Sequence, residues 1–90
     1  MNQQLKSPDL EQADNQMNLR DKLKQDLKAN RWTLKDVCRE ANVYQSTLSL
    51  ILQGKSVPTY ERAVLLAKIA TEKTGIAYTP LMFIYNKVNP

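Results

Sequence analysis

Histidine is absent from the 90 residues, cysteine occurs once, and glycine occurs twice. Without an imidazole, the usual general base of enzymes is missing. Cys38 has neither a second thiol nor an imidazole with which to form a metal site or a nucleophilic pair. Gly54 and Gly75 alone cannot make a glycine-rich phosphate-binding loop. We therefore expect no enzyme, no cofactor and no metal site, and we expect Cys38 to be structural.

The sequence also lacks long apolar runs and a second cysteine. The apolar run LMFIY at 81–85 is far too short for a membrane span, which takes about 20 residues. No signal-peptide pattern is recognisable, and a single cysteine cannot form an internal disulfide. These features predict a protein of the reducing cytoplasm.

Charge and composition divide the chain in two. Residues 1–18 contain one basic residue against three acidic ones, so residues 19–90 hold 12 basic and 6 acidic residues, an excess of six. Residues 1–18 are rich in Gln, Asn and Asp and lack helical apolar spacing, which predicts a disordered polar tail with no assigned function. Residues 19–90 are long enough for one small domain, and its basic charge suits a polyanionic partner.

A first helix signature begins at Thr33, whose hydroxyl can cap free backbone N–H groups while Asp36 completes a capping box. The helix should end at Asn42, a residue that tolerates the left-handed conformation of a sharp helix exit. Val43 can fill the angle that follows. Small and apolar residues recur at helical spacing between these ends: Leu34, Val37, Cys38 and Ala41. The pattern predicts a helix of about two turns followed by a short turn.

A second helix signature follows directly and ends at Gly54. Its apolar face holds Leu48, Ile51 and Leu52. Its opposite face holds Gln45, Ser46 and Ser49. That outer face is polar but uncharged, and Leu50 lies outside the buried set.

Together these residues resemble the helix-turn-helix family of phage repressors and Cro proteins. The positions that match the family pattern are Thr33, Val37, Cys38, Asn42, Val43, Leu48, Ser49, Ile51, Gly54 and Pro58. With flanking helices the resemblance covers residues 19–74. It implies an all-α fold, a compact bundle of about five short helices in which the second and third form the helix-turn-helix.

The resemblance further implies that the second signature is a recognition helix in the major groove of double-stranded DNA. Gln45 and Ser46 are similar to the glutamine and serine that open the recognition helix of the phage lambda repressor and touch bases. The expected base-contacting residues are Gln45, Ser46, Ser49 and Leu50, the last of which could meet a thymine methyl. The expected backbone-contacting residues are Thr33, Tyr44, Gln53, Lys55 and Ser56.

Three residues depart from the family pattern. Leu34 stands where many members carry a glutamine that contacts phosphate and braces the first glutamine of the recognition helix. Cys38 replaces an alanine. Tyr44 stands where a small capping residue is usual, and its ring could lie against a sugar or a thymine methyl, or pack on the first helix of the bundle.

Three flanking helices are predicted, at 19–29, 60–74 and 80–88. The first has Asn18 as its cap and a core stripe of Leu19, Leu23 and Leu27. The second needs Ala63, Leu66, Ala67 and Ala70 for the core. The third begins at Thr79 with Pro80 in its first position.

The last two of these helices carry more apolar residues than one small core needs. We therefore predict a homodimer, with its interface formed by Leu65, Ile69, Leu81, Ile84, Tyr85 and Val88. The alternative is that LMFIY at 81–85 forms a short strand or only caps the core.

The predicted function is a sequence-specific DNA-binding transcriptional regulator, a repressor that binds a palindromic operator as a homodimer. It would be associated with the bacterial nucleoid or encoded by a phage or plasmid. Two alternatives remain open. One is an antitoxin of the same fold, which would bind a protein partner through its tail or its apolar C-terminal face. The other is a protein-interaction module that has lost DNA binding, suggested by Leu34 and the uncharged recognition helix.

Overall fold

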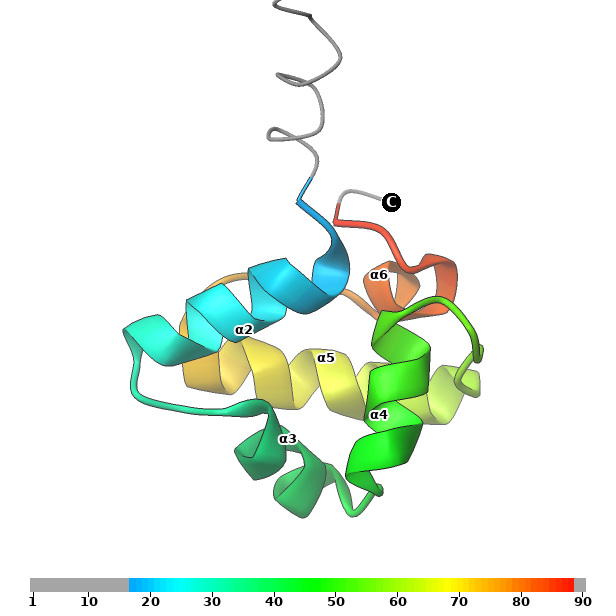
Figure 1. The fold of residues 1–90 in the computed structure, drawn as a ribbon, viewed down its shortest axis with the longest axis horizontal. Coiled ribbons are helices and arrows are strands. Elements are labelled where there is room, and N and C mark those ends of the chain that lie inside the picture. Colours follow the sequence, from blue (N-terminus) through cyan, green and yellow to red (C-terminus); the bar gives the residue numbers. More distant parts are fainter. Residues whose placement is uncertain (1–16, 89–90) are drawn as a thin grey trace, which may run out of the picture.

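A computed structural model of the chain describes residues 17–88 (Figure 1). The polar tail predicted at 1–18 lies outside the described residues except for its last two. Five helices and no strand occur in the described part. They are Leu19–Ala29 (α2), Leu34–Ala41 (α3), Gln45–Leu52 (α4), Tyr60–Thr74 (α5) and Pro80–Tyr85 (α6). The prediction of an all-α bundle is therefore confirmed.

Helix α5 forms the centre of the bundle. It runs across the middle of the molecule in Figure 1 and packs against α2, α3 and α6. The residues that the sequence assigns to its core face are all buried: Ala63, Leu66, Ala67 and Ala70. Three of these four are alanines, and their small side chains let neighbouring helices approach the α5 backbone closely.

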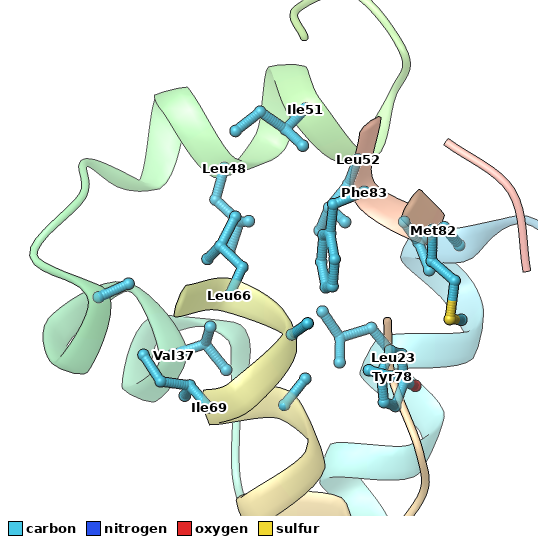
Figure 2. Close-up of a cluster of buried hydrophobic side chains, with 14 of the residues drawn as sticks. Leu23, Val37, Leu48, Ile51, Leu52, Leu66, Ile69, Tyr78, Met82 and Phe83 are labelled. Carbon is cyan, nitrogen blue, oxygen red and sulfur yellow. The ribbon is translucent and has the colours of Figure 1, made fainter. Parts of the chain in front are cut away.

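One hydrophobic cluster contains side chains from all five helices (Figure 2). Its largest fully buried members are Phe83, Leu19, Leu23, Leu27, Leu48, Ile51, Leu52, Leu66 and Val37. Figure 2 shows Phe83 of α6 beside Leu52 of α4, two helices that pack together. The C-terminal helix therefore belongs to the same core as the helix-turn-helix.

Local capping signals set the helix ends. At the start of α2, Asn18 Oδ1 accepts a hydrogen bond from the Asp21 N–H at 2.8 Å. At the start of α5, Thr59 Oγ1 accepts one from the Arg62 N–H at 3.2 Å. Gly75, with φ 73°, ends α5 in the left-handed conformation that glycine adopts without a Cβ clash. These ends lie where the sequence predicts them.

The last helix is shorter than predicted. Asn86 takes the left-handed conformation, with φ 56° and ψ 48°, and its backbone N–H donates to the Met82 carbonyl, so α6 ends at Tyr85. Val88 lies beyond the helix, and the expected helical face through residue 88 is wrong. The alternative of a short strand is also wrong, whereas Met82 and Phe83 do cap the core.

Ile69 also differs from its prediction. The sequence pattern assigns Ile69 to the dimer interface, but only 5% of its surface is exposed. Helix α3 packs on α5 at this point, and Figure 2 shows Ile69 near Val37 of α3. The core face of α5 is therefore wider than the alanine stripe, and Ile69 is already covered within one chain.

A partly buried polar cluster of Lys22, Asp26 and Tyr78 joins α2 to the segment between α5 and α6. The Tyr78 hydroxyl donates to Asp26 Oδ2 at 2.5 Å, and Lys22 Nζ reaches the same oxygen at 2.6 Å. Burial opposes ionisation of Asp26, but the hydrogen bonds from Lys22 and Tyr78 and the Lys22 charge lower the pKa of this carboxyl below its ordinary value. Burial, together with the bond to Asp26, raises the pKa of the Tyr78 phenol.

Stability is expected to fall as the solution becomes acidic below the ordinary aspartate pKa of 3.8. Asp26 and Asp36 both have a lowered pKa in the folded chain, so the unfolded chain takes up protons first as the pH falls. Their contribution is therefore present above pH 3.8 and is lost as the pH falls through the folded values. Thermal unfolding between pH 7 and pH 2 measures this loss. The double variant Asp26→Asn and Asp36→Asn should show a shallower dependence, and an unchanged slope would contradict the assignment.

Lys73 is the one buried lysine of the described residues, with 8% of its surface exposed. Its ammonium lies 3.5 Å from the centre of the Trp32 ring and pairs with the Glu40 carboxylate. A cation over an indole face is favourable when partly desolvated. Lys73 therefore ties the C-terminal part of α5 to α3 and to the loop before it.

Candidate nucleic-acid interface

The start of α3 is fixed by a complete capping box. Thr33 Oγ1 accepts from the Asp36 N–H at 3.4 Å, while Asp36 Oδ2 accepts from the Thr33 N–H at 2.9 Å. These bonds from the Thr33 N–H and hydroxyl, with the charges of Arg39 and Lys73, lower the pKa of Asp36 below its ordinary value. The capping box holds this helix terminus, and Thr33 is exposed, so the terminus is accessible to a ligand.

The turn between α3 and α4 is short and follows the prediction. Asn42 is left-handed, with φ 57° and ψ 46°, and its backbone N–H donates to the Cys38 carbonyl. Val43 packs against the core beside it. Tyr44 is 81% exposed, so its ring does not pack on α2, and its side chain makes no capping bond to α4. The hydroxyl and ring of Tyr44 are therefore free to contact a ligand at the start of α4.

Helix α4 has the two faces that the sequence predicts. Its inner face, formed by Leu48, Ile51 and Leu52, is buried. Its outer face is polar: Gln45 and Ser46 are exposed and Ser49 is half-buried. The inner face fixes α4 on the core, so the outer side chains project from a rigid helix rather than from a loop.

A shallow groove brings three of the four expected base-contacting residues together. It lies between α2, the start of α3 and the outer face of α4, and its lining residues are Arg20, Leu34, Cys38, Gln45, Ser46, Leu48 and Ser49. Leu50 is not among them, although 44% of it is exposed on a neighbouring face of α4. Cys38 is 4% exposed, and burial raises the pKa of its thiol, in agreement with a structural role.

Arg20 is a site residue that the sequence pattern does not identify. It lies on α2 among charges of alternating sign, a pattern typical of a solvated helix face. The fold turns it toward the groove that also holds Gln45 and Ser46. Its position depends on the packing of α2 against α3 and α4, and no local signal in the sequence encodes that packing.

A second hollow adds basic charge beside the start of α3. It lies between α2 and α3, next to Trp32, Thr33 and Leu34. The ionisable groups around it are Lys24, Lys28, Lys35 and Asp21. Three lysines against one aspartate give this edge of the site a positive character, which suits phosphate groups.

The C-terminal end of α4 carries the remaining expected contacts. Gln53 Nε2 donates to Ser49 Oγ at 2.7 Å, so the Gln53 amide and the Ser49 hydroxyl are already joined before any ligand binds. Gly54 leaves the helix with φ 77°. Lys55 is exposed and Ser56 half-buried in the following loop. The five expected backbone-contacting residues therefore lie at three places: the start of α3, the start of α4 and the loop after α4.

Among residues 17–88, no helix combines the length and the apolar character that a membrane crossing requires. The same part of the chain contains no group of three or more side chains suited to hold a metal ion.

Comparison with known families agrees with this geometry. The family model described as helix-turn-helix matches residues 23–69, just over half of the chain. The chain therefore belongs to the helix-turn-helix family, in agreement with its resemblance to Cro proteins and phage repressors. Its fold is that of DNA-binding transcription regulators. No curated protein and no solved structure shows significant similarity to the chain.

Proposed function

We propose that this protein is a sequence-specific transcriptional regulator that binds a palindromic operator as a homodimer and represses by covering a promoter. The observation that carries the proposal is the outer face of α4. Gln45, Ser46 and Ser49 share one groove-facing surface, on a helix that is held from behind by a buried apolar face. A rigid helix with exposed amide and hydroxyl groups suits the major groove, where base edges present donors and acceptors.

Gln45 is the proposed discriminating residue. A glutamine amide can donate to N7 and accept from N6 of adenine, which is worth about 1–3 kcal/mol against a wrong base. Because α4 itself carries no charge, most of the affinity would come from basic residues around it. Arg20, Lys35 and Lys55 are exposed at the edges of the site and are proposed to contact phosphates.

A dimer is proposed because α5 and α6 retain exposed apolar side chains. Leu65 is 40% exposed, Leu81 45% and Tyr85 61%. Ile84 and Val88 are half-buried and would contribute their outer surfaces. Two copies related by a twofold axis would place two α4 helices about 34 Å apart, in successive major grooves.

The experiment that tests this function is the selection of bound sequences from random duplex DNA, followed by titration of the selected sequence across salt concentrations. A palindromic motif whose binding weakens steeply with salt is expected. The absence of any enriched sequence would overturn the proposal and favour a protein-interaction module of the same fold.

Two substitutions should separate base reading from phosphate binding. Gln45→Ala should flatten base preference at one position in each half-site, because it removes a base-edge contact. Lys55→Ala should weaken binding to all sequences and reduce the salt slope by about one, because it removes a phosphate contact. Lys68→Ala, an exposed lysine on α5, is the control and should change neither quantity. Equal effects of the first two changes on selected and random DNA would contradict this division.

A further inference from the structure

Asn86, directly after α6, contacts the C-terminal end of α4. In the amide orientation that its neighbours require, Nδ2 donates to the Leu52 carbonyl at 3.1 Å and the side-chain oxygen accepts from the Gly54 N–H at 3.3 Å. The Gly54 N–H is shared with the Ile51 carbonyl at 3.0 Å. The backbone N–H of Asn86 meanwhile closes α6 on Met82. One residue therefore caps the ends of two helices.

Gly54 is shaped for this contact. A Cβ at position 54 would lie 2.7 Å from the nearer polar atom of the Asn86 side-chain amide, which is the oxygen in the orientation given above, so any side chain there would push the amide away. Gly54 also has φ 77°, a conformation that disfavours other residues. The glycine thus serves both the helix exit and the approach of Asn86.

The two ends of α4 are held differently. Tyr44 provides no side-chain cap at the first end, and the Gln53 side chain bonds within the helix, to Ser49. In the part of the chain that the structure describes, the side-chain hydrogen bonds that reach the end of α4 from another helix come from the Asn86 amide. The Gln53 bond, by contrast, stays within α4. The last carbonyls of a helix have no partner inside it, and the Leu52 carbonyl finds one in Asn86.

We propose that Asn86 is a positioning residue for α4, and that it links the recognition helix to α6. The DNA part of this inference rests on the proposed function. Helix α6 carries the exposed Leu81 and Tyr85, where a second copy of the chain is proposed to bind. A partner that shifts α6 would move the Asn86 amide and with it the end of α4. By linkage, operator binding would favour the same arrangement of α6, so pairing of the two copies and base reading would support each other.

Asn86→Gly tests the link with little change to the backbone, because glycine also adopts the left-handed conformation. Asn42→Gly is the matched control, since Asn42 is left-handed as well, with φ 57°. The first readout is amide hydrogen exchange at residues 52–55, measured by NMR without DNA. The second is the ratio of affinities for the selected operator and for random DNA. The conservative change Asn86→Asp keeps an acceptor for the Gly54 N–H but loses the donor to the Leu52 carbonyl.

In Asn86→Gly, exchange at 52–55 should become about tenfold faster, and the affinity ratio should fall about tenfold, as expected for the loss of hydrogen bonds of ordinary strength. Asn86→Asp should also speed exchange at 52–55, because one carboxylate oxygen would face the Leu52 carbonyl with no proton to donate. Asn42→Gly should leave the exchange at 52–55 at the wild-type level. Unchanged exchange in Asn86→Gly would overturn the link between α6 and α4. Faster exchange with an unchanged affinity ratio would overturn the positioning role.

These outcomes are separable from failure of the proposed function. A wild-type chain that selects no DNA sequence would overturn the proposed function and the DNA part of this inference. The exchange measurement needs no DNA, and it would still confirm or refute the contact between Asn86 and α4.

Discussion

Replacing Phe83 with alanine is expected to lower the free energy of unfolding by about 3–5 kcal/mol. The ring is 1% exposed and lies in the core beside Leu52 of α4 (Figure 2). Its removal leaves a cavity that the surrounding helices can fill only in part. Small domains have a total stability of about 5–15 kcal/mol, so this single change should remove a large fraction of the free energy of unfolding.

Urea or thermal unfolding followed by circular dichroism measures this loss. Tyr60→Ala is the matched control, because Tyr60 is an aromatic residue on α5 with 65% of its surface exposed. It should change stability by no more than roughly 0.5 kcal/mol. Similar losses in both variants would show that α6 is not part of the cooperative core. The family match ends at residue 69, whereas the core continues to Phe83. A large loss in Phe83→Ala would therefore show that the folded domain extends beyond the matched residues.

Leu81→Glu is expected to convert the proposed dimer into monomers and to weaken binding to the proposed operator about 100-fold or more, because two linked recognition helices gain affinity from binding together. Leu81 is the exposed apolar residue at the start of α6, with 45% of its surface accessible, so a glutamate there should leave the core intact. A buried charge at a subunit contact is costly unless it is paired. Sedimentation velocity and DNA titration measure the two effects.

Ile76→Glu is the control for this substitution. Ile76 is 40% exposed and lies between α5 and α6, outside the proposed interface. It should leave both the mass and the affinity unchanged. If Leu81→Glu leaves the sedimentation coefficient at its wild-type value, the proposed dimer surface is wrong, whatever happens to DNA binding.

The helix ends could be predicted from the sequence because their signals are local. Thr33 and Asp36 form the capping box within three residues, and Gly75 ends α5 by its own backbone freedom. The inner face of α4 could be predicted for the same reason, since helical spacing determines which residues share a face. Predicting these elements requires no knowledge of which helices pack against them.

The features that were missed depend on partners far apart in the chain. Ile69 is buried because α3 packs against α5. Arg20 lines the groove because α2 packs beside α4. Tyr78 bonds to Asp26 across 52 positions. The contact of Asn86 with the end of α4 likewise depends on how α6 docks. Periodicity identifies which residues can be buried, but the arrangement of helices decides which neighbours they meet.

The contact between Lys73 and Trp32 makes the intrinsic tryptophan fluorescence a probe of one place in the fold. Trp32 is the single tryptophan of the sequence, so indole emission comes from one place, the junction of α2, α3 and α5. Loosening of this junction would move the ammonium away from the ring and change the emission without any added label. Tryptophan fluorescence would therefore report on the contact of α3 with α5, while circular dichroism averages over all the helices. A difference between the two unfolding curves would reveal a partly opened state in which α3 separates before the rest of the bundle.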